Sequence, residues 1–412
     1  MSDDDHLKNL LNFIKQGKTI IKDRNVLHFS YLPTTILHRK NEQGKILQSL
    51  SPILKHSRPS NLLIYGKPGT GKTLVVKKIL KLIIDDNAKE NKFPIKLVYT
   101  NSKDEMTLYG LLVSLGSQLG LKSQKPLTNN EDWLPKTGLS ISMVFNIIIK
   151  TIIKNKFNTV FVIDEIDNLA DLVSKTGKDI LYQLTRANER IDQGSLTLIG
   201  ISNDLTFKER LDPRVISSLS EEEIIFTNYN AYQLKEILLD RIKHAFVDDN
   251  SVEESALNLC SALAGREHGD ARRAIDLLRV ASEIAEREQS STIKPHHIKS
   301  AYRKMEEDKE ITTLKSYSLH EKLLILSVLK AKKFYTGEIY TIYKEFCKKI
   351  SQKELTQRRV TQLLSELELS GMVSGRIISQ GIHGRTKKYT SSISYETVVN
   401  TLKNDTIFYD LI

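Results

Sequence analysis

Short apolar runs rich in β-branched residues alternate with longer helical patterns through the first half of the chain. The first run begins at Asn61 and stops at a glycine-rich loop. The later runs cover Ile95–Thr100, Thr159–Ile163, Leu196–Ile201 and Glu222–Thr227. Strands that alternate with helices favour a parallel sheet with ligand sites at the carboxyl ends of its strands. The pattern therefore predicts an α/β domain with a parallel five-stranded sheet over residues 1–227, including an N-terminal linker.

The strand signals end with the fifth run, and the chain continues with helical patterns. Four helices are predicted, at Ala231–Phe246, Ser251–Ala264, Asp270–Arg287 and Pro295–Glu307. Ser251 with Glu254 has the spacing of a capping box, Asp270 is a suitable N-cap, and Pro295 suits a first helical position. We interpret residues 228–308 as a small helical domain that leads into a charged hinge at Glu306–Lys315.

The C-terminal part of the chain has a third kind of pattern. Helical periodicity covers Leu319–Lys332, Thr336–Lys349 and Thr356–Ser370, and a β-like segment punctuated by Gly and Ser follows at Met372–Ser394. Three helices followed by a hairpin are the layout of a winged helix. We assign this domain to residues 309–412.

The glycine-rich loop after the first run fits the phosphate-binding pattern G-x-x-x-x-G-K-[ST], with a strand before it and a helical pattern at Leu74–Leu82 after it. Glycine lets backbone N–H groups point inward around an anion, and the following helix presents its positive end there. Lys72 would reach the β and γ phosphates, and the Thr73 hydroxyl would hold Mg²⁺. The residues predicted to contact ATP or GTP are Gly66, Lys67, Pro68, Gly69, Thr70, Gly71, Lys72 and Thr73. The pattern ends at Thr73, and the apolar Leu74 that follows is not part of this set.

Polar residues end two further predicted strands. The run TVFVIDEID delivers Asp164 and Glu165 to the carboxyl edge of the sheet. Asp164 would support Mg²⁺ there, and Glu165 would orient and activate water. Asn203 ends the next run and would position the attacking water, although ordinary turn chemistry accounts for an Asn at this place equally well.

Two arginines are candidates for contact with the transferred phosphate. Arg214 follows a Pro-containing turn and would act as an arginine finger on the nucleotide of a neighbouring subunit, the alternative being a structural surface arginine. Arg272 lies in the first turn of a predicted helix, where the helix dipole disfavours a solvated positive charge. A role at the γ-phosphate is therefore favoured for Arg272.

The net charge of +11 over 412 residues raises the expectation of a polyanionic partner. From Glu310 to Ile412, 16 Lys and Arg residues stand against 10 Asp and Glu residues, so +6 of the excess falls on the predicted winged helix. Its third helix has an apolar stripe at i, i+3, i+4 and i+7, formed by Val360, Leu363, Leu364 and Leu367. The side chains predicted to contact duplex DNA are Arg358, Arg359 and Gln362 on this helix and Arg385, Lys387 and Lys388 on the hairpin. A solvated helix face is the alternative.

Composition argues against several other classes of protein. No run comes near the length of about 20 apolar residues that a membrane span needs. The N-terminus is acidic, whereas a signal peptide begins with a basic segment that an apolar one follows. Cys260 and Cys347 lie far apart in sequence, so neither a disulfide framework nor a zinc site is indicated. His296 and His297 are interpreted as surface residues near a helix start. We expect a cytoplasmic, nucleoid-associated protein with no membrane partner.

The ordered motifs GKPGTGKT, VIDEID, ISND, LDPRV and GDARRA resemble those of AAA+ ATPases. With YLPTTILHR, LYQLTRANE and the winged-helix tail, the chain resembles the archaeal origin-recognition and replication-initiator family, which is related to the eukaryotic origin recognition complex and its helicase-loading relative. This resemblance implies a P-loop domain, a helical lid and a C-terminal winged helix. It assigns Lys72 and Thr73 to Walker A, Asp164 and Glu165 to Walker B, Asn203 to sensor one, Arg214 to the finger, Arg272 to sensor two, and Tyr31 and Arg39 to the wall of the adenine pocket.

The same resemblance implies an ATP-dependent initiator that binds duplex DNA at replication origins and helps recruit or load the replicative helicase, with other initiator paralogues as further partners. ATP and ADP would act with Mg²⁺ as a conformational switch, and hydrolysis would be slow. The segment Asn101–Gly120 resembles a DNA-contacting insertion of this family, although its leucine stripe indicates packing. The alternatives are a clamp-loader-like or DNA-remodelling motor and an ATPase-coupled transcription regulator.

Overall fold

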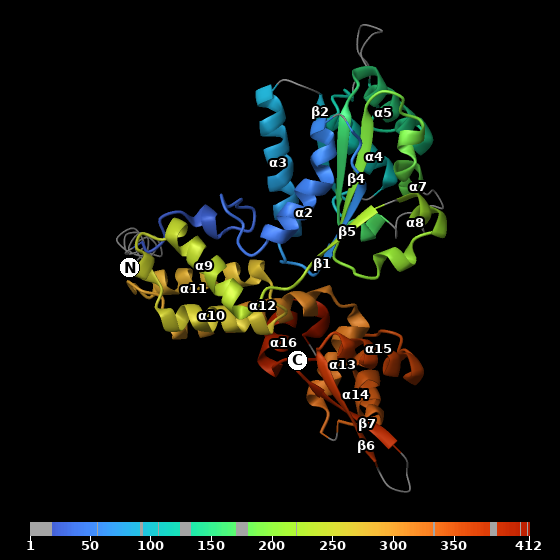
Figure 1. The fold of residues 1–412 in the computed structure, drawn as a ribbon. Coiled ribbons are helices and arrows are strands. Elements are labelled where there is room, and N and C mark those ends of the chain that lie inside the picture. The colour runs from blue at the N-terminus through green and yellow to red at the C-terminus, as the bar shows by residue number, and fades with distance from the viewer. Residues whose placement is uncertain are drawn as a thin grey trace, which may run out of the picture. The chain divides into compact units, whose positions relative to one another are not determined.

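The computed structural model describes residues 19–412 except 56, 91–93, 106, 124–132, 170–179, 220, 333, 380–384, 404 and 410, and it leaves out the side chains of residues 89, 90, 379, 385 and 386. The chain forms two compact units, Met1–Ile298 (unit 1) and Lys299–Ile412 (unit 2). Figure 1 shows the helices and strands of each unit.

Unit 1 contains a parallel five-stranded sheet with the strand order β2–β3–β4–β1–β5. The strands are β1 (Asn61–Gly66), β2 (Ile95–Asn101), β3 (Asn158–Asp164), β4 (Ser195–Ser202) and β5 (Glu221–Phe226). The five predicted runs are thus confirmed as strands of a parallel sheet. The order places the carboxyl ends of β3, β4 and β1 beside one another, which brings three of the predicted motifs to one edge.

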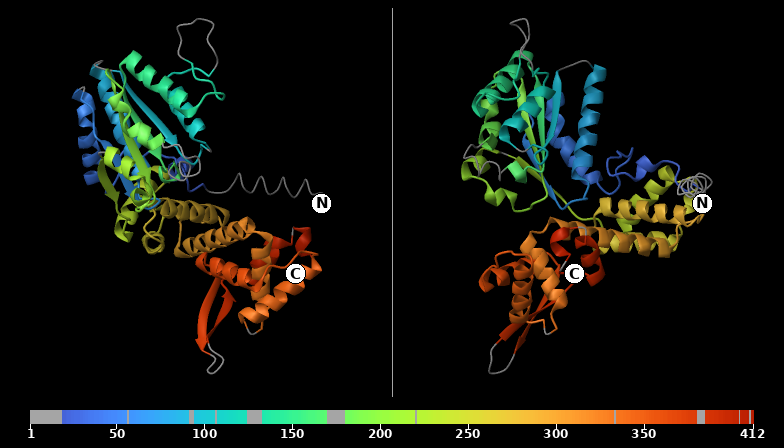
Figure 2. Two further views of the ribbon diagram at one scale, coloured as in Figure 1. Left: turned by 90° about the vertical axis from the view of Figure 1, so that its right-hand side faces the viewer. Right: turned by 180° about the vertical axis from the view of Figure 1, so that it is seen from behind.

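Helices cover both faces of this sheet because successive side chains of a strand point to opposite faces. On one face Leu62 and Ile64 of β1 pack in the core under α2 (Lys40–Leu50) and α3 (Lys72–Glu90). Leu63 points to the other face, which is covered by α4 (Leu108–Gln118), α5 (Ile141–Asn155), α7 (Ile180–Thr185) and α8 (Pro213–Leu219). The three layers are visible in Figures 1 and 2. The leucine stripe of α4 is buried in this core, as its periodicity predicted.

A group of helices follows the sheet, comprising α9 (Ala231–Ala245), α10 (Glu254–Arg266), α11 (Ala271–Arg287) and the start of α12 (Pro295–Ser316). Asp270 caps α11 as predicted, because its carboxylate accepts from the N–H groups of Arg272 and Arg273. The capping box predicted at Ser251 and Glu254 is wrong. The N-cap of α10 is Glu253, which makes no capping bond through its side chain.

The segment of residues 20–27 packs on these helices, although the sequence pattern places it in the domain of the sheet. The N–H groups of Ile20 and Ile21 donate to Glu286 Oε1 on α11 at 3.1 and 3.2 Å. Arg241 on α9 is buried, and its Nη1 donates to the carbonyl of Val26 at 3.1 Å. The segment thus belongs by its contacts to the helical part of unit 1.

Unit 2 has the elements of a winged helix, which are α13 (Leu319–Lys330), α14 (Thr336–Lys349), α15 (Gln357–Leu369), β6 (Val373–Ser379), β7 (Arg385–Ser391) and α16 (Tyr395–Leu402). Strands β6 and β7 are antiparallel, and the predicted apolar stripe of α15 is buried in the core of the unit. The predicted hinge at Glu306–Lys315 is wrong, since α12 is helical throughout that stretch. Among the helices of the described residues, none combines the length and apolar character that crossing a membrane requires.

Candidate nucleotide site and winged-helix surface

The phosphate-binding loop joins the fully buried strand β1 to helix α3. Gly69 and Gly71 have φ angles of 73° and 90°, in the left-handed region that glycine adopts at little cost. The buried Thr70 hydroxyl donates to the carbonyl of Lys67 at 2.8 Å, which closes the loop on itself. The loop has the concave backbone that phosphate binding requires.

Helix α3 follows the loop without a gap, as the phosphate-binding pattern requires. The helix begins at Lys72, two residues before Leu74, where its apolar periodicity was predicted to start. Its first N–H groups therefore face the loop. Leu74 itself is half-buried and packs against the core under α2 and α3, so its side chain adds no polar group to the site.

Lys72 is held at the centre of the loop by oxygen acceptors. Its Nζ donates to the carbonyls of Gly66 and Lys67 at 2.6 and 2.9 Å and to Asn203 Oδ1 at 2.9 Å. Burial lowers the pKa of Lys72 to about 8, while the charge of Asp164 acts in the opposite direction. Asn203, predicted from a strand end, therefore does reach the loop through Lys72.

Asp164 ends β3 beside the loop and lies within hydrogen-bonding reach of the helix α3 start. Its Oδ2 accepts from the Thr73 hydroxyl at 2.7 Å. A carboxylate and a hydroxyl next to phosphate-binding N–H groups fit Mg²⁺, which prefers oxygen ligands and is shared with substrate phosphates. The residues predicted to hold the metal are thus adjacent.

Tyr99 on β2 is a residue of this site that the sequence analysis missed. Its hydroxyl donates to the same Asp164 Oδ2 at 2.7 Å, and Lys77 Nζ lies 4.1 Å from the centroid of its ring. Burial, with the charge of Asp164, raises the pKa of Tyr99, so the hydroxyl keeps the proton that it donates. An aromatic residue is ordinary in a strand, and the sequence therefore carries no signal for this contact.

Glu165 follows Asp164 in a strained backbone conformation with a φ of 53°. Its backbone carbonyl accepts from the Ser102 hydroxyl. Its Oε2 forms an ion pair of 2.7 Å with Lys103 Nζ, which comes from the turn after β2. The carboxylate predicted to activate water is thus already paired with a cation.

The N-terminus of α11 docks directly on the phosphate loop. Ala271 N–H donates to the carbonyl of Gly69 at 3.3 Å. A Cβ built on Gly69 would lie 1.7 Å from Asp270 Oδ1, so only glycine allows this approach. Arg272 stands in the first turn of the same helix and lines the cavity beside the loop. The helical part of unit 1 thereby closes one side of the site.

A cavity of about 600 Å³ opens at this edge of the sheet, within the 300–1,000 Å³ range of small-molecule sites. Tyr31, Leu74, Ile237 and Ile275 are among its apolar and aromatic lining, and the Arg241 guanidinium lies 4.5 Å from the Tyr31 ring centroid. The cavity is also lined by Pro68, Gly69 and Gly71 of the loop and by the predicted site residues Lys72, Thr73, Asp164, Glu165, Asn203 and Arg272. Charged groups together with apolar and aromatic side chains suit a nucleotide.

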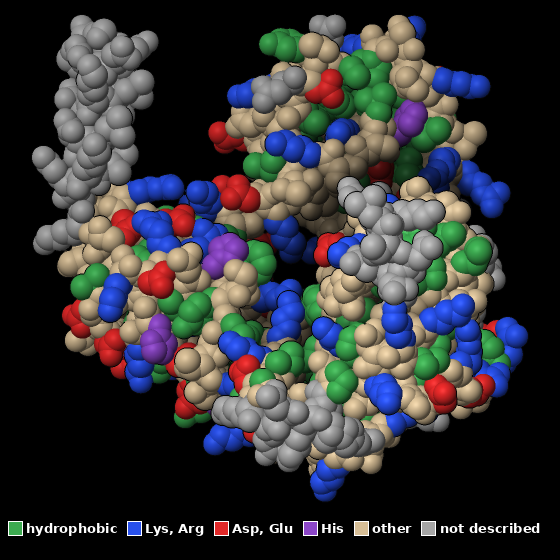
Figure 3. Space-filling model, turned by 90° about the horizontal axis from the view of Figure 1, so that it is seen from above, with side chains coloured by type: hydrophobic (Ala, Val, Ile, Leu, Met, Phe, Trp, Pro, Cys, Tyr) green, Lys and Arg blue, Asp and Glu red, His purple; other side chains and the backbone are tan. Residues whose placement is uncertain are grey.

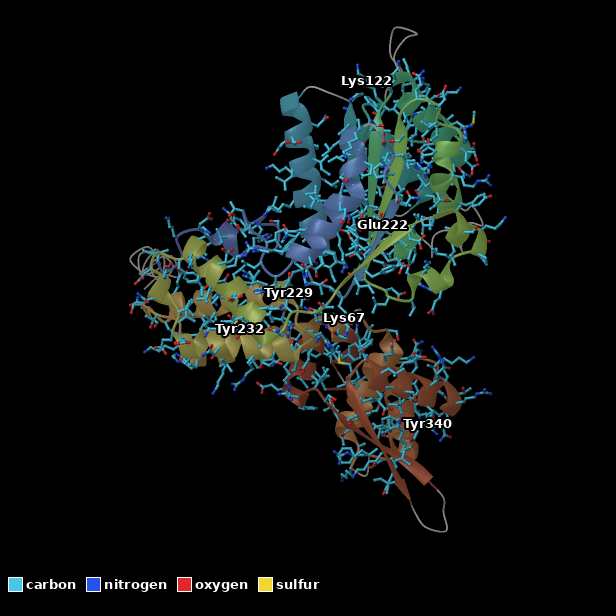
Figure 4. All side chains as sticks on the ribbon, viewed as in Figure 1. Lys67, Lys122, Glu222, Tyr229, Tyr232 and Tyr340 are labelled. Atoms are coloured by element: carbon cyan, nitrogen blue, oxygen red, sulfur yellow. The ribbon has the colours of Figure 1, made fainter. Side chains whose placement is uncertain are left out.

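Arg39 is predicted to wall the adenine pocket, but it is not among the described residues that line the cavity. It is 2% exposed, and its Nε donates to the carbonyl of Thr70 at 3.0 Å and to Tyr229 OH at 3.1 Å. Its Nη2 donates to the carbonyl of Thr227 at 2.5 Å. Figure 4 labels Tyr229, which lies where β5 leads into α9. Arg39 therefore joins the phosphate loop to the start of the helical part.

Arg214 also lies away from the lining of the cavity. It stands in the first turn of α8 with an exposed side chain, pairs with Asp212 at 2.9 Å, and lies 5.7 Å from the ring centroid of Tyr182. Within one chain the described residues do not bring Arg214 to the nucleotide site. Its assignment as a finger on a neighbouring subunit stays a prediction.

A group that could hold a metal among the described residues consists of Glu288, His296 and His297. The interpretation of both histidines as surface residues is wrong for His297, which is 1% exposed. His297 Nδ1 accepts from the N–H of Lys294 at 2.9 Å, so its Nε2 carries the proton toward Glu288 Oε2 at 3.1 Å. Burial lowers the pKa of His297. A protonated Nε2 is a hydrogen-bond donor and not a metal ligand.

The outer face of α15 presents the side chains that the sequence predicts to contact DNA. Arg358, Arg359 and Gln362 are exposed, and Arg359 pairs with Glu366 at 3.3 Å. On β7, Lys388 Nζ lies 5.1 Å from the Phe334 ring centroid, whereas Lys387 pairs with Glu368 of α15. The Arg385 side chain lies outside the described part of the chain. Lys387 thus fastens the wing to α15. Lys and Arg side chains are dispersed over the face of the molecule that Figure 3 shows.

A phosphate loop, an acidic strand end and a helical part that closes on them define an AAA+ ATPase, and unit 2 adds a C-terminal winged helix. Family models for an AAA domain, a Cdc6 AAA+ ATPase-type lid domain and the C-terminal winged helix domain of CDC6 match residues 55–207, 235–303 and 312–401. These matches confirm the predicted fold class.

Relatives and a solved structure agree with this class. The chain is 60% identical over 411 residues to the ORC1-type DNA replication protein of Cenarchaeum symbiosum, which covers 100% of this chain and 98% of the relative. It is 39% identical over 401 residues to ORC1-type DNA replication protein 1 of Archaeoglobus fulgidus, over 96% of this chain and 94% of the relative. The structure of the Aeropyrum pernix ORC1 protein in complex with DNA matches with a TM-score of 0.78 and 35% identity, over 96% of this chain and 100% of that one. The chain belongs to the archaeal family of ORC1-type DNA replication proteins.

Proposed function

We propose that this chain is an ATP-dependent replication initiator that binds duplex DNA at replication origins. The observation that carries the proposal is that one chain combines two features. It has an ATPase site that the helical part of unit 1 closes on one side, and a winged helix with exposed Arg358 and Gln362. The Aeropyrum pernix ORC1 protein, which is 35% identical, was solved in complex with DNA. Arg and Gln side chains on a helix in the major groove read guanine and adenine edges.

The nucleotide acts as a conformational switch in this proposal. Helix α11 touches the phosphate loop at Gly69 and places Arg272 beside it. A γ-phosphate bound in the loop therefore adds negative charge next to Arg272 and the helical part of unit 1. The ion pair between Lys103 and Glu165 opposes the use of Glu165 as a base, which supports slow hydrolysis. Mg²⁺ held through Thr73 and Asp164 would accompany ATP or ADP.

Further partners follow from the family and not from the contacts of a single chain. The replicative helicase would be recruited or loaded by the DNA-bound protein, and paralogous initiators would be neighbours whose nucleotide Arg214 completes. A duplex-DNA partner also implies a cytoplasmic, nucleoid-associated protein.

The ATPase rate separates a switch from a motor. We expect turnover well below the about 1–100 s⁻¹ of kinases, with little change on adding duplex DNA. Fast turnover that duplex DNA stimulates would favour a clamp-loader-like or remodelling motor instead. Footprinting of bound sites across the host genome separates the remaining alternative, since occupancy of promoters without origins would indicate a transcription regulator.

Two alanine substitutions test the DNA surface. Arg358→Ala is expected to cost about 1–3 kcal/mol on the specific site and little on random duplex, because base contacts carry specificity. Lys388→Ala removes a wing charge that touches phosphate and is expected to weaken binding to both duplexes alike, with a shallower salt dependence. Equal losses on both duplexes for Arg358→Ala would refute the reading of bases by α15. Fluorescence anisotropy at two salt concentrations measures both effects.

A further inference from the structure

Two tyrosine hydroxyls hold the backbone of Leu355, the residue immediately before the N-cap of α15. Tyr343 OH accepts from the N–H of Leu355 at 3.2 Å, and Tyr340 OH donates to the carbonyl of the same residue at 3.2 Å. Both tyrosines stand on α14 about one turn apart, and Figure 4 labels Tyr340 there. We call Tyr340 and Tyr343, with these two bonds, the tyrosine clamp.

The clamp is itself fixed by the core of unit 2. Tyr343 is 0% exposed, and its ring stacks on that of Tyr340 with centroids 6.2 Å apart. Its hydroxyl lies 2.7 Å from His320 Nδ1 on α13. The hydroxyl oxygen can accept a second hydrogen bond besides the one from Leu355, so either Tyr343 or His320 can donate in this pair, according to the tautomer of His320. Helices α13 and α14 therefore determine together where Leu355 lies.

The clamp supplies what the apolar packing of α15 lacks. The buried stripe from Val360 to Leu367 determines which face of the helix turns inward, but apolar contact is non-directional and permits small shifts along the helix axis. Hydrogen bonds prefer a narrow range of distance and angle. Two of them on Leu355 therefore determine where the first turn of α15 begins, and with it the place of Arg358.

We infer that the tyrosine clamp sets the sequence discrimination of the winged helix by holding the first turn of α15 in register with the base edges of duplex DNA. Paired hydrogen bonds to a base edge require that the side chains lie within about 0.5 Å of the position in which they bind the base. Contacts to the phosphate backbone carry no sequence information. Tyr340 and Tyr343 are positioning residues that act through Leu355. The inference rests on the proposed reading of DNA by α15.

The opposite end of the same helix offers a matched control. Tyr317 OH donates to Ser370 Oγ at 2.6 Å, and Ser370 is the C-cap of α15. Tyr317→Phe therefore removes one tyrosine hydroxyl bond from α15, far along the helix from Arg358. A loss of specificity that arises from general loosening of α15 would appear in this variant too.

The experiment compares Tyr340→Phe, Tyr343→Phe, the double variant, Tyr317→Phe and Arg358→Ala in the full chain. Each Phe substitution keeps the aromatic ring, and circular dichroism with thermal unfolding establishes that the variants are folded. The probes are a duplex that the unaltered chain enriches from a randomised pool and a scrambled duplex of equal length, each measured by anisotropy with ATP. In the double variant we expect the ratio of the two affinities to fall about tenfold, with the affinity for scrambled DNA unchanged within about twofold.

Tyr317→Phe is expected to leave the ratio of the affinities for the enriched and the scrambled duplex as it is in the unaltered chain. If Arg358→Ala lowers the ratio while the double Phe variant leaves it unchanged, the clamp inference is overturned and the proposed function stands. A ratio that Arg358→Ala also leaves unchanged overturns the reading by α15, and the clamp inference with it. An equal fall in Tyr317→Phe and the double variant overturns the clamp inference as well, because the effect would then belong to the whole helix.

Discussion

Replacement of Arg39 by methionine is expected to lower the free energy of unfolding by about 3 kcal/mol or more and to weaken ATP binding about tenfold. The guanidinium is buried and donates to Thr70, Thr227 and Tyr229, and also to Glu42 Oε1 at 3.0 Å. Methionine fills a similar volume but donates to none of these acceptors, and the bonds to the Thr70 carbonyl and the Tyr229 hydroxyl are buried. Each buried polar group that loses its partner costs about 1–3 kcal/mol.

ATP binding is expected to suffer as well because one of the lost partners belongs to the phosphate loop. Arg39 holds the carbonyl of Thr70, and its guanidinium lies 4.0 Å from the ring centroid of Tyr229 at the start of the helical part. Without this link, the loop and α11 are no longer held in one arrangement before ATP arrives. Ordering them then consumes part of the binding free energy.

Denaturant unfolding without nucleotide and titration with a fluorescent ATP analogue measure the two effects. Arg24→Met is the matched control, since Arg24 is an exposed arginine of the same unit that pairs with Glu286, and exposed pairs contribute about 0–1 kcal/mol. Arg39→Lys keeps the charge without the planar fork and should fall between the two. An Arg39→Met chain with unaltered unfolding and ATP affinity would contradict the role assigned to this residue.

ATP affinity is expected to fall about tenfold for each pH unit above the pKa of Lys72, which burial lowers to about 8. A bound triphosphate stabilises the ammonium and raises this pKa. Above pH 8 each binding event must therefore take up a proton, and that step becomes less favourable as pH rises. Below pH 8 Lys72 is charged before ATP arrives, so its contribution to the pH dependence disappears.

The stability of the nucleotide-free chain responds to the same group with the opposite sign. The pKa of Lys72 is about 8 in the folded chain against an ordinary value of 10.5. Between these two values the unfolded chain binds more protons than the folded one, so the contribution of Lys72 to the free energy of unfolding rises with pH. Below about pH 8 both states hold the proton, and this contribution is constant.

Calorimetric titration of ATP in two buffers with different ionisation enthalpies measures the proton uptake directly. We expect close to one proton per ATP at about pH 9 and close to none at about pH 7. Lys72→Arg is the control, since a guanidinium stays charged over this range and its ATP affinity should not depend on pH through this position. Absence of proton uptake at the higher pH would show that Lys72 is charged in the free protein.

Local sequence patterns predicted the strands well and placed the residues of the candidate site on the elements that carry them. The run before GKPGTGKT, the acidic end of the Asp164 strand and the stripe of α15 each lie within a few consecutive residues, and each is found in the fold at that place. Such patterns are readable because hydrophobic periodicity and glycine-rich turns act over one element. Other predictions failed, among them one short-range spacing, the capping box at Ser251 and Glu254. The hinge at Glu306–Lys315 was inferred from charge alone, and a charged stretch forms a helix as readily as a linker.

Short segments of the chain were enough to indicate the class of this protein, its phosphate loop, its acidic strand end and its winged helix, because neighbouring residues dictate the geometry of each. The contacts between these segments and distant parts of the chain were decided only by the tertiary structure. Arg39 meets Thr70 across 31 positions and Tyr229 across 190, and Tyr99 meets Asp164 across 65. Contacts of this kind depend on strand order and helix docking, which the burial of many side chains determines together, and no spacing in the chain records them.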